Sequence, residues 1–146
     1  MTRIVLPTAM ALIGLGTLAI AHTGVSNPAV LARMESMTET QDNTKVLGAM
    51  VKGERDFDVM AARAAAAEIA RHAKQTPDLF RIKEMDPKTE ALPAIWEDFD
   101  DFTAKSKSLE DVATSLAASL ETEDQLRAGL GQIGAACKAC HKSYRE

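Results

Sequence analysis

Residues 134–146 read GAACKACHKSYRE and contain both cysteines of the chain, Cys137 and Cys140, followed at once by His141. From this run back towards the N-terminus, apolar side chains recur at steps of three and four residues, the spacing of one buried helix face. These side chains are Leu126, Leu130, Ile133, Cys137, Cys140 and Tyr144. The C-x-x-C-H run is therefore predicted to lie in the last turns of a long helix rather than in a loop.

Three earlier segments also carry helical patterns, and no stretch shows the sustained two-residue alternation that indicates strands. The predicted helices are Pro28–Lys52, Asp58–Lys74, Phe99–Leu120 and a last one that starts at the Thr122–Gln125 capping box. An irregular segment from Gln75 to Asp98, with three prolines, separates the first two helices from the last two. This order predicts an all-α fold, an antiparallel four-helix bundle that holds a cofactor between facing helices.

The N-terminal residues have the pattern of a secretory signal peptide. Arg3 precedes an uncharged, mostly apolar run from Ile4 to Ile20, which closes on the small-x-small sequence Ala19-Ile20-Ala21. We therefore expect residues 1–21 to be removed, and residues 22–146 to form one periplasmic domain without stable membrane insertion. The alternative is an uncleaved membrane anchor, for which this run is short and is interrupted by one proline and two glycines.

The net charge of the mature domain indicates which kinds of macromolecule it can bind. Arg3 leaves with the signal, so 16 of the 17 Lys and Arg residues remain against 21 Asp and Glu, a net charge of −5. An acidic domain of this kind disfavours nucleic acid as a partner, and it allows electrostatic pairing with a basic protein.

A C-x-x-C-H run serves three known chemistries: a redox disulfide, half of a zinc site, or covalent attachment of a c-type haem. A structural zinc site needs four ligands, and beyond this run the mature chain offers only His22 and His72 as histidines. Redox-active disulfides lie at helix N-termini, where the dipole lowers the thiol pKa, whereas these cysteines lie near a predicted C-terminus. Haem attachment fits this placement best, with thioether bonds from Cys137 and Cys140.

With this motif near its C-terminus, the chain resembles the class II c-type cytochromes, the cytochrome c′ and cytochrome c-556 family. The matching segments are GQIGAACKACHKSYR at residues 131–145, LGAMVKGERDFD at residues 47–58 and LPAIWED at residues 92–98. The resemblance implies an exported four-helix bundle with one covalently bound haem c. It also implies that dimers are common, with contacts through the first two helices, so a homodimer is possible here.

The resemblance assigns roles to single residues. His141 would be one axial ligand of the iron. In the family pattern, the opposite (distal) position lies four residues after an arginine that pairs with a haem propionate; Arg33 matches this arginine and Met37 the distal position. Trp96 would pack over the haem pocket, and Arg145 would lie near the proximal face. The alternative for Met37 is a core methionine that does not bond iron, and the next candidate ligands are Met34, Met60 and His72.

These roles predict a periplasmic monohaem cytochrome, not an enzyme, that carries single electrons between redox protein partners with His/Met ligation. The main alternative is a five-coordinate, high-spin cytochrome c′ that binds nitric oxide or carbon monoxide. A haem-free helical interaction protein is the third possibility.

Overall fold

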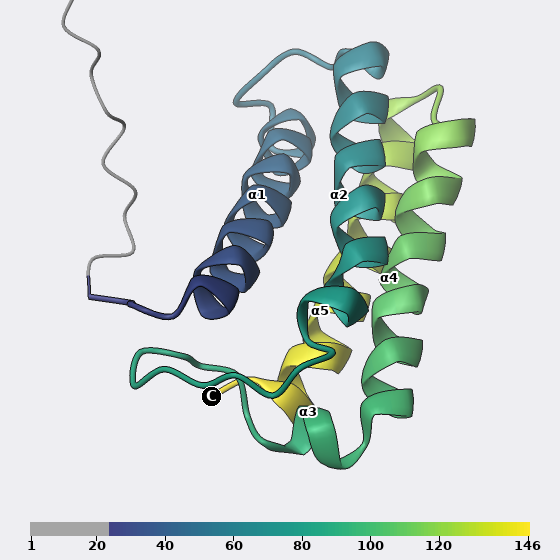
Figure 1. Ribbon diagram of the computed structural model, residues 1–146. Helices are drawn as coiled ribbons and strands as arrows, with labels where there is room; N and C mark the ends of the chain where they lie inside the picture. Colours follow the sequence, from purple (N-terminus) through teal and green to yellow (C-terminus); the bar gives the residue numbers. More distant parts are fainter. Residues whose placement is uncertain (1–23) are drawn as a thin grey trace, which may run out of the picture.

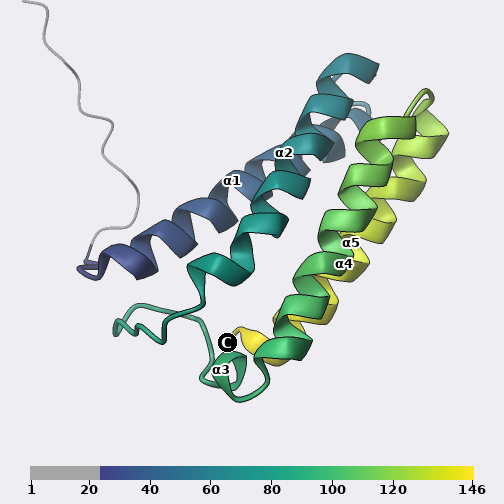
Figure 2. The same cartoon turned by 45° about the vertical axis from the view of Figure 1, so that its right-hand side comes forward.

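The structure, a computed structural model, describes residues 24–146, so the predicted signal peptide lies outside the described residues. The described chain contains four long helices and one short one (Figure 1). Their bounds are α1 Pro28–Val51, α2 Val59–Leu79, α3 Ala94–Glu97, α4 Phe99–Ser119 and α5 Glu123–Tyr144. Successive long helices run in opposite directions, which confirms the predicted antiparallel four-helix bundle (Figures 1 and 2).

Helix starts follow the capping residues in the sequence. The Asn27 side chain accepts hydrogen bonds from the backbone N–H groups of Ala29 and Val30, and Asp58 caps α2 in the same way. At α5, the side chains of Thr122 and Gln125 each bond the other's backbone, which is the predicted capping box. These contacts satisfy N–H groups that have no partner inside the helix, and they fix where each helix begins.

The end of α2 differs from the prediction. The helix continues past Lys74 to Leu79, with Pro77 inside its last turns. A proline has no N–H, so the carbonyl of Ala73, four residues earlier, loses its helical partner. The Ser106 hydroxyl of α4 donates to this carbonyl at 2.7 Å, and this contact compensates for the missing bond. The irregular segment is therefore shorter than predicted, and α3 lies within it.

The apolar core occupies one end of the bundle. Its fully buried side chains come from all four long helices and from Leu120, which follows α4; they include Leu47, Met50, Ile69, Ala113, Leu126 and Ile133. A second, aromatic cluster lies at the other end, where Phe80, Phe102 and Tyr144 meet. α2 packs most extensively against α4, and among the neighbouring long helices of the bundle α1 and α5 touch least. The space between α1 and α5, next to the aromatic cluster, is where the functional site lies.

Gly129 marks the closest approach of α5 to α4, and its substitution provides a stability test. A Cβ at this position would lie 2.5 Å from Leu116 Cδ1 and 3.1 Å from its Cγ, so Gly129→Ala requires α4 or the leucine to move. At Gly131 no atom lies within 4 Å of such a Cβ. We expect Gly129→Ala to be less stable than Gly131→Ala by about 1–3 kcal/mol, because both gain the same helix propensity and only one is overpacked. Urea unfolding of the two variants measures this difference, and equal midpoints would contradict the close packing.

None of the helices within residues 24–146 is both long enough and apolar enough to cross a bilayer.

Candidate functional site

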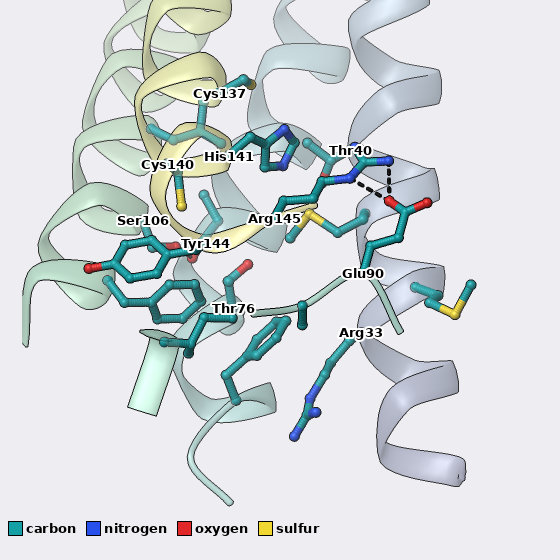
Figure 3. A pocket seen from close by; sticks show the side chains of 18 of the residues that line it. Arg33, Thr40, Thr76, Glu90, Ser106, Cys137, Cys140, His141, Tyr144 and Arg145 are labelled. Carbon is teal, nitrogen blue, oxygen red and sulfur yellow. Dashed lines mark hydrogen bonds and ion pairs between the residues drawn. The ribbon is translucent and has the colours of Figure 1, made fainter. Parts of the chain in front are cut away.

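A cavity of about 530 Å³ opens between α1 and α5, and the segment after α2 covers one side of it. This volume is in the range of small-molecule and cofactor sites. Cys137, Cys140 and His141 all line it from α5, so the structure brings the whole C-x-x-C-H run to one cavity (Figure 3). The aromatic rings of Phe80 and Tyr144 form part of its wall.

The two cysteines are free thiols on successive turns of one helix. Burial raises the pKa of both thiols, to about 11 for Cys140. Catalytic dithiols need the opposite shift, because the thiolate is the reactive form. The environment therefore does not suit redox disulfide chemistry. Within residues 24–146, no three His, Cys, Asp or Glu side chains are grouped as a metal-binding cluster.

The His141 imidazole is set up to remain neutral. The residue is exposed, but partial burial of its ring lowers the pKa of His141, and the nearby Arg145 cation lowers it further. Glu90 acts in the opposite direction, with a smaller effect. A neutral imidazole at neutral pH keeps a nitrogen lone pair free for a metal.

Arg145 lies beside His141 and pairs with Glu90 of the segment that covers the cavity (Figure 3). Its guanidinium donates from Nε to the Glu90 carboxylate at 2.6 Å, and Nη2 contacts the same oxygen. The backbone reinforces the pair, because Leu92 N–H donates to the Tyr144 carbonyl and Glu146 N–H donates to the Glu90 carbonyl. The C-terminus is thus tied to the segment that covers the cavity.

Of the candidate distal ligands, Met34 and Met37 line the cavity from α1, opposite α5. Gln41 and Thr44, which interrupt the apolar stripe of this helix, line it as well. Met60 is 68% exposed and lies away from the cavity, and His72 is buried in contacts with α1 that lie outside the lining. The structure therefore groups two of the four candidates with His141.

Arg33 lines the cavity but is only 3% exposed, and its guanidinium is bound by backbone carbonyls. Nε, Nη1 and Nη2 donate to the carbonyls of Leu79, Glu84 and Ile82 at 2.7–2.9 Å. The guanidinium points towards the segment after α2 and away from Cys140 and His141 (Figure 3). Burial lowers its pKa, and the charge of Glu84 offsets part of this effect. Arg33 thus holds the covering segment, and its pairing with a propionate stays a prediction.

Trp96 lies behind the cavity wall instead of in it. Its Nε1–H donates to the Phe80 carbonyl at 2.7 Å, and its ring lies 6.3 Å from the Phe80 ring. Phe80 itself lines the cavity, between the Arg33 guanidinium and the ring of Phe102. Trp96 therefore supports the wall through Phe80.

Sequence reasoning missed several residues of the cavity wall. Tyr144 was predicted to lie on a buried helix face, but the convergence of Phe80, Phe102 and Tyr144 on one cavity depends on how α2, α4 and α5 pack. Tyr144 is oriented by its hydroxyl, which donates to Asp101 at 2.5 Å, and this bond raises the pKa of the phenol. Lys88 also lines the cavity, and nothing in the irregular segment distinguished it.

Asp86 fixes the covering segment against the start of α1, and it provides a pH-dependent prediction. Its buried carboxylate accepts hydrogen bonds from the backbone N–H groups of Lys88 at 2.9 Å, Ser26 at 3.0 Å and Asn27 at 3.3 Å. These bonds lower the pKa of Asp86, with the Lys88 bond the largest cause. A lowered carboxyl pKa contributes stability above the unfolded-state value, and this contribution is lost as the pH falls through the folded-state value.

Asp86→Asn is therefore expected to lower the melting temperature at neutral pH, and the difference from the parent should shrink below about pH 4. Thermal unfolding between neutral and acidic pH measures this, with the exposed Asp56→Asn as the matched control. A difference that stays constant across the pH range would show that the charged form of Asp86 is not the stabilising one.

The described residues fit a covalently attached haem. Two half-buried thiols one turn apart face a cavity of cofactor size, and a neutral imidazole follows them on the same helix face. Most of the exposed surface of the wall is apolar, which suits a porphyrin, and the positive charge of Lys88 suits propionates.

Comparison with known proteins also indicates a c-type haem protein. The sequence profile of the family described as Cytochrome C′ matches residues 28–145. Cytochrome c-556 of Agrobacterium fabrum (strain C58) is 40% identical over 100 residues, which cover 68% of this chain and 68% of that protein. The NMR-validated structural model of oxidized R. palustris cytochrome c556 aligns with a TM-score of 0.74 at 28% identity, covering 83% of this chain and 98% of that one. A nitric oxide complex of a cytochrome c prime variant from Alcaligenes xylosoxidans aligns with a TM-score of 0.69 at 27% identity, over 81% and 94% of the two chains.

The profile match spans almost all of the described chain and includes the C-x-x-C-H run. The chain therefore belongs to the cytochrome c′ family of periplasmic c-type cytochromes, whose haem c is attached covalently through two cysteines.

Proposed function

We propose that this protein carries single electrons, with His141 and Met37 as the two axial ligands of a low-spin haem iron. The observation that carries the proposal is that both side chains line one cavity, His141 from α5 and Met37 from α1. Met/His ligation is the arrangement of electron-transfer cytochromes, and it raises the reduction potential. Neither this function nor gas binding requires turnover of a substrate.

In this proposal Cys137 and Cys140 hold the haem through thioether bonds, which form from their thiols. The haem, when bound, supplies reversible one-electron chemistry at its iron. His141 contributes a neutral nitrogen, because its pKa is lowered by its surroundings. Covalent attachment to a rigid helix keeps the site at a fixed distance from the surface at which a redox partner docks.

The residues of the cavity wall affect the reduction potential of the haem iron. Phe80, Phe102 and Tyr144 exclude water from the side next to α4. A dry wall disfavours the additional positive charge of the oxidised state, and so it also raises the reduction potential. The Glu90–Arg145 ion pair lies beside His141 and leaves little net charge there.

We also propose that residues 1–21 are removed as a signal peptide. Residues 22–146 would then act in the periplasm, and redox proteins there would be the partners. A homodimer also stays a prediction.

Gas binding is the second candidate function, supported by the likeness to the nitric oxide complex of a cytochrome c prime variant. It requires that Met37 does not bond iron and that the distal face stays open to a small ligand. Met37 is only half-buried, and α1 and α5 have few contacts, so this face could admit a diatomic molecule.

Absorption spectra of the purified holoprotein in both oxidation states distinguish the two functions. A low-spin oxidised spectrum with a methionine–iron charge-transfer band, unchanged when carbon monoxide is added to that state, is the expected result. The reduced protein should bind carbon monoxide slowly, because Met37 must first dissociate. A high-spin spectrum with immediate carbon monoxide binding would replace the electron-carrier proposal with gas binding.

A further inference from the structure

Polar contacts make up most of what holds α1 beside the cavity. Its buried side chains in this part are Val30, Arg33, Ser36 and Thr40, so three of the four are polar, and its large buried apolar side chains, Leu47 and Met50, lie near the other end of the helix. The cavity separates α1 from α5, so α2 and the segment after it must position the helix.

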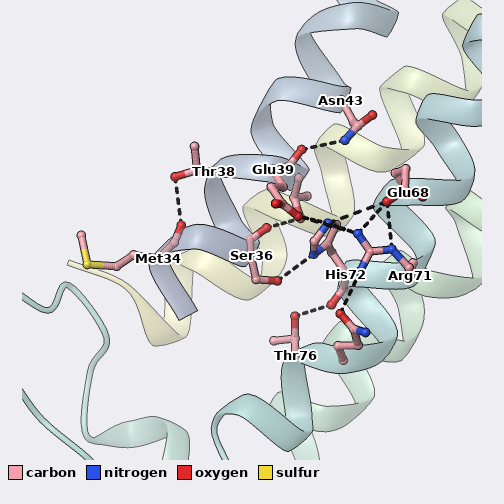
Figure 4. Close-up of polar contacts among 11 residues, drawn as sticks. Met34, Ser36, Thr38, Glu39, Asn43, Glu68, Arg71, His72 and Thr76 are labelled. Carbon is pink, nitrogen blue, oxygen red and sulfur yellow. Dashed lines mark hydrogen bonds and ion pairs between the residues drawn. The ribbon is translucent and has the colours of Figure 1, made fainter. Parts of the chain in front are cut away.

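The main contact between α1 and α2 at this level is His72, which is 4% exposed (Figure 4). Its Nδ1 lies 3.1 Å from the Ser36 hydroxyl, and its Nε2 lies 2.6 Å from the Glu39 carboxylate. Arg71 Nη2 lies 2.7 Å from the same Nε2, and it also pairs with Glu68 at 2.6 Å. Figure 4 shows that Met34 points away from this network.

The two contacts of His72 with α1 are compatible with one tautomer of its ring. Nε2 cannot both donate to Glu39 and accept from Arg71. Arg71 already has Glu68 as a partner, whereas the Glu39 contact needs a proton on Nε2. With the proton there, Nδ1 can accept from the Ser36 hydroxyl, so the ring can bond both α1 partners at once.

These contacts fix the rotation of α1 about its axis. Successive helix residues are turned by about 100°, so Ser36 and Met37 face different neighbours. Ser36 faces α2 and bonds His72, and Met37, the next residue, faces the cavity. Apolar contacts tolerate small rotations, but a hydrogen bond does so much less, because its energy depends steeply on angle.

We propose that His72 is a positioning residue for the distal ligand: by bonding the buried Ser36 hydroxyl, with the half-exposed Glu39 as a weaker second contact, it holds α1 in the rotation that directs Met37 into the cavity. This inference rests on the proposed ligation by Met37. It gives His72, itself a weaker ligand candidate in the sequence, a role that acts through α1 rather than on the iron.

Amide substitutions separate the two ring contacts. An asparagine amide reaches the place of Nδ1, so His72→Asn retains a partner for Ser36. A glutamine amide reaches the place of Nε2, so His72→Gln retains a partner for Glu39 and loses Ser36. Ser36→Ala removes the same contact from the other helix. Arg63→Ala is the matched control, because Arg63 also joins α2 to another element, through the Leu120 carbonyl at 2.8 Å, but at the core end of the bundle.

The experiment compares the methionine–iron charge-transfer band and the reduction potential of the holoproteins at one neutral pH. Ser36→Ala and His72→Gln are expected to reduce the band by about half or more and to lower the potential, because unligated conformations become populated. His72→Asn is expected to retain most of the band, and Arg63→Ala is expected to lower only the unfolding midpoint.

Two results would overturn the inference and leave the proposed function intact. One is a parental band in Ser36→Ala and His72→Gln, and the other is an equal loss of the band in Arg63→Ala or His72→Asn. If the parent protein itself has no methionine–iron band, the proposed ligation fails, and this inference fails with it.

Discussion

Replacement of both Cys137 and Cys140 by serine is expected to give a polypeptide that carries no covalently bound haem. The thioether bonds need sulfur, and a serine hydroxyl does not form an equivalent bond. His141 would remain as an iron ligand, but a single coordinate bond does not survive denaturation. The double variant should therefore show the mass of the amino acids alone, whereas the parent is heavier by one haem.

Intact-mass measurement under denaturing conditions, after expression in a periplasm with the attachment machinery, checks this prediction. Lys138→Ala is the matched control, because Lys138 lies between the two cysteines, is exposed and does not line the cavity. A parent protein with no additional mass, or a double variant that keeps it, would contradict haem attachment at these cysteines.

Met37→Ala is expected to convert the oxidised protein from a low-spin to a high-spin spectrum. A methyl group cannot reach the iron, so the iron would lose its sixth ligand, and the loss of the thioether should lower the reduction potential. The truncated side chain also enlarges the cavity on the α1 side, and so carbon monoxide should bind the reduced variant faster than the parent.

Met34→Ala is the control for this variant, because Met34 is a methionine of the same helix that lines the same cavity. Absorption spectra and a redox titration of the three proteins are the measurements. If Met34→Ala instead loses the methionine–iron band, the ligand is assigned to the wrong methionine, and if neither variant changes the spectrum, no methionine bonds iron.

Much of the fold could be predicted from local patterns. The predicted helix starts at Pro28, Asp58 and the Thr122–Gln125 capping box lie within one residue of the observed ones, because capping depends only on residues within one turn. The end of α2 could not be predicted in this way. Pro77 is a local helix-breaking signal, and the compensating hydroxyl of Ser106 comes from a residue that is distant in the sequence.

The residues of the candidate site are likewise of two kinds: some could be placed from local spacing, and others only from the tertiary structure. Cys137, Cys140 and His141 share one helix face because of their spacing, so their convergence follows from α5 alone. Arg33 and Trp96 were assigned by resemblance to direct contacts with haem. In the structure Arg33 lines the cavity and bonds the Leu79 carbonyl at the end of α2 and two carbonyls of the segment after it, Trp96 supports Phe80, and contact of either residue with haem stays a prediction. Those partners depend on how this segment folds back on α1, which no local pattern encodes.

The sequence by itself determined four helices, their polar and apolar faces, and a haem-attachment motif at the end of the last helix, because each of these depends on residues within a few turns. Only the tertiary structure decided which side chains face that motif. It brings Met37, Phe80 and Lys88 to the cavity and keeps His72 out of it, since the position of α1 is set by hydrogen bonds to residues on another helix and on the segment after it.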